Sequence, residues 1–215
     1  VGTDGVLLGA WTLVESAHRI LDIGTGTGLV ALMLAQRSLP DANIVALEID
    51  EAAVGQAREN IIRSPWKERV EVVQADFKKY RSSDKFDVIV SNPPYFVDSL
   101  ECPDRQRAAA RHNDSLTYED LLEGVSGLLA EDGFFTMVIP ADVAERVKKI
   151  ASIKKLYAVR QLNVITKPGG IPKRVLITFS FSNQECIVEE LLTELARHQY
   201  SEEYMTLTRD YYLNM

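Results

Sequence analysis

The chain repeats a simple order of hydrophobic patterns: a short apolar run, a turn, and a longer segment with apolar residues every three or four positions. The short runs predict buried strands, and the longer periodic segments predict amphipathic helices. The predicted strands are Arg19–Ile23, residues 44–49, Val70–Gln74, Phe86–Ser91, residues 134–139, Tyr157–Ile165 and residues 174–181. The predicted helices are Leu29–Arg37 and residues 51–63, 118–129 and 141–152.

Strands and helices alternate in this pattern, which predicts an α/β fold with a mostly parallel sheet and helices on both faces. No repeat or long linker divides the sequence, so we expect residues 1–215 to form a single domain. Residues 98–115 and the turn cluster 167–173 interrupt the alternation, and a loop as long as the first is usually functional or disordered. Residues 189–197 have helical spacing but also fit a short strand.

Composition narrows the class of protein. A net charge of −7 and a pI near 5.1 disfavour nucleic-acid binding through bulk charge, although a local basic face is still compatible. Cys102 and Cys186 are too few for a disulfide framework or a metal cage, so we expect reduced thiols, no metal and a cytoplasmic protein. No apolar run is long enough for a membrane span, and the chain carries no signal-peptide pattern. Because the chain begins at Val1 without Met, we expect a further segment upstream.

The most informative motif is Asn92-Pro93-Pro94-Tyr95, directly after the predicted strand Phe86–Ser91. Two prolines remove backbone donors and fix φ, so the strand cannot continue. The motif is therefore a stiff turn at the carboxyl end of a strand, where open α/β sheets bind ligands. It offers an amide oxygen from Asn92, a proline carbonyl and the flat face of Tyr95, a set suited to holding a planar amine. The alternative is a stiff turn with no chemistry.

A glycine loop joins the first predicted strand to the first helix, with Gly24, Gly26 and Gly28 at alternate positions. Glycines let the chain turn sharply and let a ligand approach the backbone. The dinucleotide fingerprint requires a glycine where this chain has Leu29. The spacing instead fits a cofactor without a pyrophosphate, with S-adenosylmethionine (SAM) as the leading candidate. The alternative is a tight strand–helix turn that binds nothing.

Acidic residues lie at or just after the ends of the first three predicted strands. Glu48 lies about 20 residues after the glycines, where an acid that binds ribose hydroxyls belongs. Asp50 is an alternative, or else the N-cap of the next helix. Asp76 can accept a hydrogen bond from an adenine amine and Phe77 can pack on the ring, although Asp76 also fits an N-cap. Asp22 can hold the methionine ammonium or brace the glycine turn.

Together these residues resemble a class I SAM-dependent methyltransferase with an amine-directed Asn-Pro-Pro-Tyr motif. The match narrows to the bacterial tRNA1(Val) (adenine-37-N6)-methyltransferase family and covers essentially the whole chain. The segments that carry it are 1–11 (VGTDGVLLGAW), 31–37, 59–61, 64–66, 172–176, 200–204, 207–208 and 211–213. Family members carry a short stretch before the Val-Gly-Thr-Asp segment that is absent here.

The resemblance implies a seven-stranded Rossmann-like sheet with an antiparallel last strand, SAM as the cofactor and Thr3 as part of its site. It also implies methylation of N6 of adenine 37 in the anticodon loop of tRNA, by a monomer. The Asn92 side-chain oxygen and the Pro93 carbonyl would accept the two amine hydrogens, and Tyr95 would stack on the flipped base, because such stacking stabilises bound bases.

Basic residues near this motif are candidates for RNA contact. We predict a phosphate clamp formed by Arg105, Arg107 and Arg111. We predict a second RNA contact formed by Lys167, Lys173 and Arg174. Ordinary solvated charge is the alternative for each. For Tyr204, Tyr211 and Tyr212 we favour packing over RNA stacking.

Three competing functions share parts of this pattern. An amine-directed motif also accepts a protein glutamine, as in release-factor methyltransferases, or a guanine amine in ribosomal RNA. A module that keeps SAM as a structural ligand is the third, but its expected mark is a damaged turn, and this turn is intact. Leu29 disfavours an NAD-dependent oxidoreductase.

Overall fold

The computed structural model describes residues 2–93, 116–197 and 199–212. Its helices are α1 Thr3–Trp11, α2 Leu29–Arg37, α3 Glu51–Ile62, α5 Tyr118–Leu128, α6 Ala144–Ile153 and α7 Glu202–Thr208, with 3-10 turns η1 Ala141–Val143 and η2 Arg209–Tyr211. The strands are β1 Arg19–Ile23, β2 Asn43–Glu48, β3 Val70–Gln74, β4 Phe86–Ser91, β5 Leu129–Pro140, β6 Tyr157–Ile165, β7 Arg174–Ser180, β8 Ile187–Leu192, β9 Glu194–Ala196 and β10 Gln199–Tyr200.

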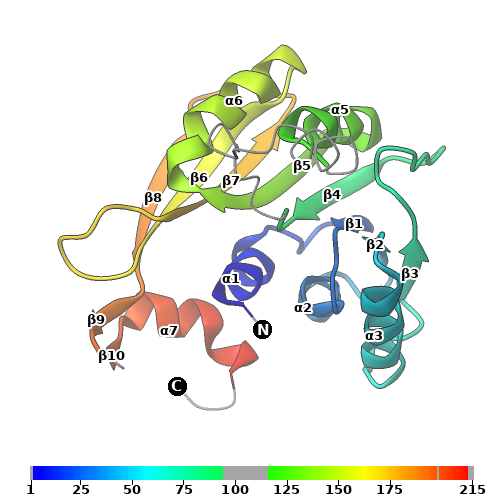
Figure 1. The fold of residues 1–215 in the computed structure, drawn as a ribbon, viewed down its shortest axis with the longest axis horizontal. Coiled ribbons are helices and arrows are strands. Elements are labelled where there is room, and N and C mark those ends of the chain that lie inside the picture. The colour runs from blue at the N-terminus through cyan, green and yellow to red at the C-terminus, as the bar shows by residue number, and fades with distance from the viewer. Residues whose placement is uncertain (1, 94–115, 198, 213–215) are drawn as a thin grey trace, which may run out of the picture.

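Eight strands form one twisted sheet in the order β3-β2-β1-β4-β5-β7-β6-β8 (Figure 1). Only β7 runs antiparallel to its neighbours β5 and β6, and the other pairs in this sheet are parallel. The predicted mostly parallel sheet with an antiparallel seventh strand is therefore confirmed, and β8 adds an eighth strand at the edge.

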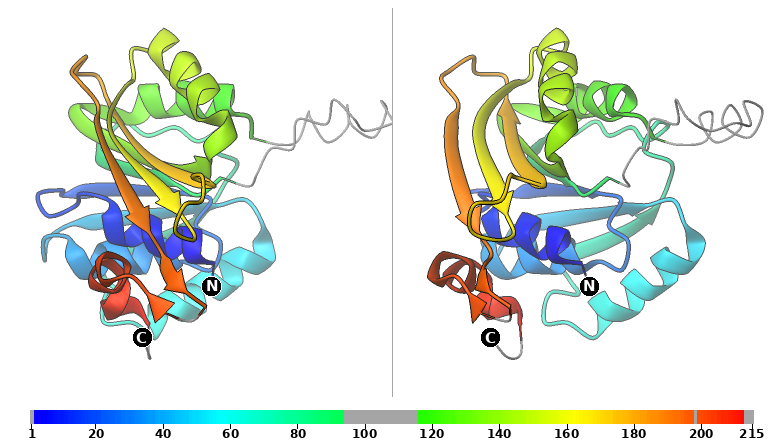
Figure 2. Two further views of the ribbon diagram at one scale, coloured as in Figure 1. Left: turned by 90° about the vertical axis from the view of Figure 1, so that its left-hand side faces the viewer. Right: turned by 60° about the vertical axis from the view of Figure 1, so that its left-hand side comes forward.

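Apolar side chains cover both faces of the sheet. Along β1, Ile20 packs in the cluster shared with α1, α2 and α7, whereas Leu21 packs in the cluster shared with α5 and α6. Successive side chains of a strand point to opposite faces, which explains this division. Figures 1 and 2 show the same layering, with α5 and α6 on one side of the sheet and α1, α2, α3 and α7 on the other.

Two predicted boundaries were wrong around β5. The strand begins at Leu129, not at residue 134, and it includes the Asp132-Gly133 pair, which lies between the predicted helix and the predicted strand. A Cβ on Gly133 would lie 3.0 Å from the carbonyl oxygens of Phe86 and Asp87, so this glycine permits close approach of two backbones. The β4–β5 register shifts at the same place, which is typical of a bulge. The predicted helix 141–152 also begins as the 3-10 turn η1 before α6.

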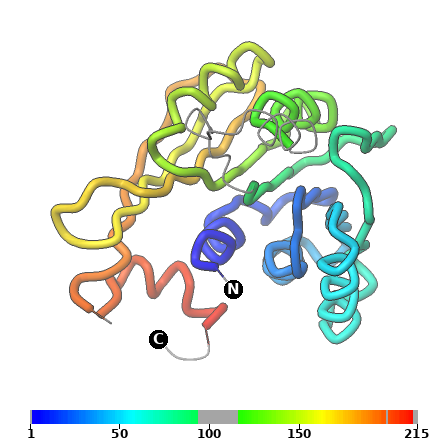
Figure 3. Tube along the Cα trace, viewed as in Figure 1, coloured from blue at the N-terminus to red at the C-terminus, as the bar shows by residue number. Residues whose placement is uncertain are grey.

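Residues 189–197, for which the sequence fitted either a helix or a strand, lie mainly in strands. β8 pairs parallel with β6, and Arg160 Nε donates to Glu189 Oε2 at 2.9 Å across that pair. Most of β8 is exposed and Leu191 is its buried member, so backbone pairing rather than core burial holds this edge strand. The tail then forms the small β9–β10 pair and α7, which lies beside α1 (Figure 3).

The sequence pattern did not predict α1, because Gly5 through Trp11 are buried without an exposed polar stripe. Gly9 explains how closely it packs, since a Cβ there would lie 2.7 Å from the Met33 sulfur of α2. The helix starts at the carboxyl edge of the sheet beside β7, where Asp4 pairs with Arg174. At its other end, the Trp11 ring lies 4.2 Å from the Arg160 guanidinium.

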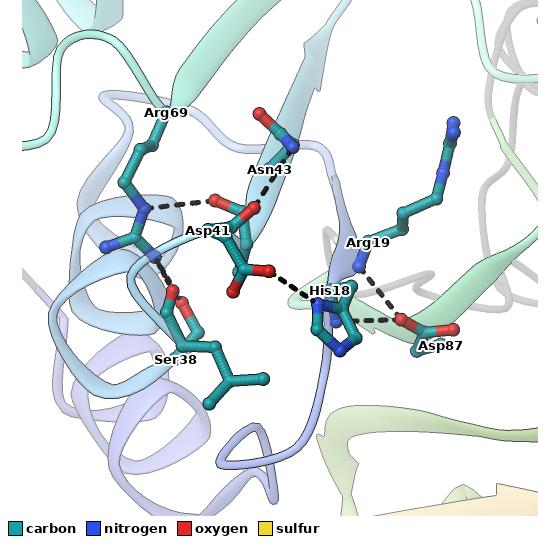
Figure 4. A network of polar contacts seen from close by, with 9 residues as sticks. His18, Arg19, Ser38, Asp41, Asn43, Arg69 and Asp87 are labelled. Carbon is teal, nitrogen blue, oxygen red and sulfur yellow. Dashed lines mark hydrogen bonds and ion pairs between the residues drawn. The ribbon is translucent and has the colours of Figure 1, made fainter.

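The amino edge of the sheet is held by polar contacts (Figure 4). The Asp87 carboxylate accepts hydrogen bonds from the amides of His18 and Arg19 at 2.8 and 2.9 Å, which joins β4 to the start of β1. Arg69 donates to the Ala42 carbonyl and to Ser38 Oγ at 3.0 and 2.8 Å. These contacts join charged side chains to main-chain groups of neighbouring segments, and they hold the amino edge of the sheet together.

Candidate active site

The glycine loop after β1 has the shape of a ligand cradle. Gly24, Gly26 and Gly28 have φ of +72°, +56° and +83°, which residues with a Cβ rarely adopt. A Cβ on Gly24 or Gly26 would meet no atom within 4 Å, whereas one on Gly28 would lie 3.4 Å from Ala57 of α3. The first two glycines therefore face open space, and the third packs the loop against a helix.

Asp22 braces this loop from beneath. Its carboxylate accepts hydrogen bonds from Thr25 Oγ1 at 2.6 Å and from the Ala31 amide in the first turn of α2. The pKa of Asp22 is raised to about 6, chiefly by burial and to a smaller extent by the charge of Glu48, while the two hydrogen bonds lower it. The side chain is 1% exposed. The bracing role is the one the contacts support, and contact with a ligand's ammonium stays a prediction.

Glu48 closes the mouth of the loop. Its Oε2 accepts from the Gly26 amide at 2.9 Å, and its Oε1 accepts from the amides of Ile49 and Asp50 at 2.8 and 3.0 Å. Asp50 caps α3 by accepting from the Ala53 amide at 2.8 Å. The two acids thus have the separate positions that the sequence suggested, with Glu48 at the end of β2 beside the loop and Asp50 at the start of α3.

Asp76 and Phe77 follow β3. Asp76 Oδ1 accepts from the Lys78 amide at 3.0 Å, which fixes a turn and leaves the acid half-buried. The Phe77 ring is 6% exposed and packs against α5, where a Cβ on Gly124 would lie 2.5 Å from it. Phe77 therefore packs in the hydrophobic core. Its contact with an adenine ring stays a prediction, which would involve the small exposed part of the side chain.

Asn92 and Pro93 lie next to the glycine loop because of strand register. Ile23 and Ser91 are paired residues of β1 and β4, so the residues that follow them, Gly24 and Asn92, leave the sheet side by side. Ser91 Oγ ties the two strand ends by donating to the Ile23 carbonyl at 3.0 Å. Asn92 is half-buried and Pro93 is buried.

Helix α1 borders the same turn. A Cβ on Gly5 would lie 3.9 Å from Asn92 Nδ2, so this helix covers the amide side chain. Tyr95 lies outside the described residues, and so do Arg105, Arg107 and Arg111.

The other predicted site residues lie on the far side of α1. Thr3 is exposed at the first turn of the helix, and Lys173 is exposed just before β7. Arg174 Nε pairs with Asp4 Oδ2 at 3.1 Å, and Nη1 donates to the Lys173 carbonyl at 3.0 Å. The pairing leaves Arg174 less available to a phosphate than its sequence position suggested. Lys167 is exposed in the turn before Lys173.

Sequence reasoning missed three supporting residues. Asp4 holds Arg174, Ser91 ties β4 to β1, and Asn60 of α3 supports the glycine loop by donating from Nδ2 to the Thr27 carbonyl at 2.9 Å. Only Asp4 had a signal, as the one acid of the segment 1–11. The other two contacts depend on distances between elements that no local pattern encodes.

Within residues 2–93, 116–197 and 199–212, no group of three or more His, Cys, Asp or Glu side chains could hold a metal ion. Within the same ranges, no helix combines the length and apolar character needed to cross a bilayer.

A glycine loop after the first strand, an acid at the end of the second and the Asn92-Pro93 turn after the fourth, on this sheet order, are typical of the class I methyltransferase architecture. The profile of the methyltransferase small domain family matches residues 5–161. Solved structures agree on the fold: one described as a predicted O-methyltransferase from Agrobacterium tumefaciens has a TM-score of 0.74 at 19% identity, covering 96% of both chains. A ribosomal protein L11 methylase from Lactobacillus delbrueckii has a TM-score of 0.57 at 16% identity, covering 82% of this chain and 76% of that one.

Sequence relatives narrow the class. The tRNA1(Val) (adenine(37)-N6)-methyltransferase of Bacteroides thetaiotaomicron is 77% identical over 215 residues, which are 100% of this chain and 91% of the relative. Proteins of the same name from Phocaeicola vulgatus and Pasteurella multocida are 53% and 43% identical, over 100% and 99% of this chain and 91% and 90% of their own lengths. The chain belongs to this family of methyltransferases.

Proposed function

We propose that the protein transfers a methyl group from SAM to N6 of adenine 37 in the anticodon loop of tRNA1(Val), acting as a monomer in the cytoplasm. Full-length relatives at 43–77% identity carry this activity in their names. The structural observation that carries the proposal is the register pair Ile23–Ser91, which sets the glycine cradle beside Asn92. Cofactor and amine would thus meet at one edge of the sheet.

The residues present fit the cofactor. The open faces of Gly24 and Gly26 leave room for a ligand against the backbone, and Glu48 lies at the mouth of the loop, where it can bind ribose hydroxyls. Asp76 would accept from the adenine amine. Thr3 stays a predicted cofactor residue, although it lies on the face of α1 that is turned away from Asn92. Bound SAM supplies an electrophilic methyl group on a sulfonium.

The adenine amine is a weak nucleophile because its lone pair is shared with the ring. Asn92 Oδ1 and the Pro93 carbonyl would each accept one of its hydrogens, which favours a more tetrahedral nitrogen and aims the lone pair at the methyl group. Such orientation lowers barriers by up to about 7–11 kcal/mol in ideal intramolecular cases. No strong base is needed for this step. Tyr95 would stack on the base, which an anticodon loop presents already partly unstacked.

Two other acceptors are less well supported. Methylation of a protein glutamine or of a ribosomal guanine amine would use the same turn. The relatives, however, match this chain along its whole length at 77% and 53% identity, and they are named for adenine 37.

Methyl transfer from radiolabelled SAM to a tRNA1(Val) transcript tests the proposal. We expect label in the unmodified transcript and none in a transcript with guanosine at position 37. Release factor and ribosomal RNA serve as competing acceptors. Equal labelling of the two transcripts, or labelling confined to a competing acceptor, would contradict the proposal.

A further inference from the structure

A cleft of about 480 Å³ opens at the carboxyl edge of the sheet beside α1. Helix α1 contributes Thr3, Asp4 and Leu7, and the ends of β6 and β7 contribute Thr166 and Lys173 among others. The tail supplies the remaining wall, with Tyr200, Tyr204 and Tyr212. The volume lies in the range of clefts that take small molecules.

The cleft and Asn92 lie on opposite sides of α1. Gly5 and Gly9 face Asn92 and α2, as the contacts of an added Cβ show. Thr3 and Leu7, one helical turn apart on the other face, line the cleft. An α-helix is about 10–12 Å across with its side chains. A nucleotide in the cleft could therefore belong to the same loop as a base held at Asn92.

The lining combines aromatic faces with one available cation. Tyr204 is 4% exposed and fixes the wall, with its hydroxyl 3.3 Å from that of Tyr212 and its ring centroid 5.4 Å from that of Tyr200. Tyr200 and Tyr212 are only half-buried, so parts of their rings face the cleft. Aromatic faces of this kind stack on bases without regard to sequence.

The charge of the lining favours a nucleotide over a free anion. The Arg174 guanidinium is paired with Asp4, and Glu194 adds a negative charge to the wall. Lys173 is exposed and makes no ion pair with any residue that the structure describes. One free ammonium beside aromatic rings and threonine hydroxyls suits a single phosphate attached to a base.

We propose that this cleft binds a nucleotide that flanks the target adenine, with its base against Tyr212 or Tyr200 and its phosphate at Lys173. The inference rests on the proposed function and extends it. It assigns a role in binding to the tail after β7, which carries the three tyrosines of the cleft, Tyr200, Tyr204 and Tyr212. It also revises the packing interpretation for Tyr212, whereas Tyr204 keeps it.

Equilibrium binding of a fluorescent tRNA1(Val) anticodon stem-loop, measured by anisotropy, tests the proposal independently of turnover. We expect Tyr212→Leu and Lys173→Glu each to weaken binding about tenfold, to raise KM for the RNA with little change in kcat, and to leave cofactor affinity unchanged. Tyr157→Leu, at the amino end of β6, and Lys149→Glu, on α6 across the sheet, are matched controls that should bind within about twofold of wild type.

A stem-loop that lacks one base next to position 37 sharpens the test. If Tyr212 stacks on that base, the stem-loop without the base should bind the wild-type protein more weakly than the complete stem-loop does. Tyr212→Leu should bind the two stem-loops equally. The assignment would be overturned if, at both flanking positions, the loss of affinity from removing the base simply added to the loss from Tyr212→Leu. It would also be overturned if both cleft variants bound RNA with wild-type affinity. Lys173 is exposed, so Lys173→Glu keeps the test valid if Tyr212→Leu does not fold. Failure of the proposed function has a different mark, the absence of label at adenine 37 with the wild-type protein.

Discussion

The two sides of α1 carry different kinds of site. On one side, the glycine loop, Glu48 and Asn92 each lie at the end of a strand, and main-chain amides hold the Glu48 carboxylate in place. On the other side, the cleft collects residues from α1, β6, β7 and the tail, and its wall depends on side-chain packing among tyrosines.

The proposed roles of the two sides explain this difference in construction: one side would carry the chemistry, and the other would recognise the RNA. Groups at the ends of strands are held in place by the rigid sheet, which suits the placement of a reacting amine and a methyl donor. A wall built from half-buried side chains on an added tail can change without disturbing the sheet, which suits recognition of a particular RNA. Substitutions on the first side should therefore affect turnover, folding or cofactor binding, and those on the second side RNA binding.

The largest expected effect is that of Asn92→Ala. Removing one of the two acceptors should lower kcat about 100- to 1000-fold, by analogy with the loss of one preorganised hydrogen-bonding group. Cofactor affinity by calorimetry should stay within about twofold. Asn43→Ala, at the exposed amino end of β2, is the control and should match wild type. Equal loss of turnover and cofactor binding would remove the assigned role.

Asp22→Asn should change how stability depends on pH. The pKa of Asp22 is raised to about 6 in the folded protein from an ordinary value of 3.8, so the folded state retains its proton at higher pH than the unfolded state. The stability of the wild type relative to Asp22→Asn should fall as pH rises from about 4 to about 6, by on the order of 3 kcal/mol, and stay level above that. Urea unfolding of both proteins at several pH values measures the difference. A constant difference across this range would show that Asp22 is not held in this environment.

Glu48→Ala should weaken cofactor binding about tenfold or somewhat more, because it removes a charged acceptor at the loop mouth and frees the Gly26 amide. Calorimetry with S-adenosylhomocysteine measures the affinity. Glu51→Ala is a matched control in the exposed first turn of α3. If both variants lost affinity equally, overall charge rather than a specific contact would explain the effect.

The smallest effect concerns Asp4, which lies at the boundary of the two sides. Asp4→Asn releases Arg174, and a partly exposed ion pair contributes less than about 1 kcal/mol, so folding should change little. RNA affinity should rise about two- to threefold. The slope of log affinity against log salt should steepen by nearly the amount expected for one added phosphate contact. Asp142→Asn, in η1 on the opposite face, is the control. Unchanged affinity and slope would mean that Arg174 has no path to the RNA.

Local patterns predicted most elements because short buried runs and periodic helices have few other solutions. The bounds of β1, α2, β3, β4 and β6 were predicted correctly from such patterns. The start of β5 was wrong because Asp132-Gly133 reads as a turn, while the glycine in fact serves a close approach to β4. Helix α1 was missed because a helix buried on all sides has no polar stripe to give it a period.

The same division holds for the site. The sequence determined the glycine loop, the acid after β2, the Asn92 turn and the family, because each is a contiguous motif at a strand end. Only the tertiary structure decided that Asp22 braces the loop, that Phe77 turns into the core, that Asp4 occupies Arg174 and that three tail tyrosines wall a cleft. Those outcomes depend on which segments the sheet order brings together, and pairing between residues up to 170 positions apart leaves no mark on either segment alone.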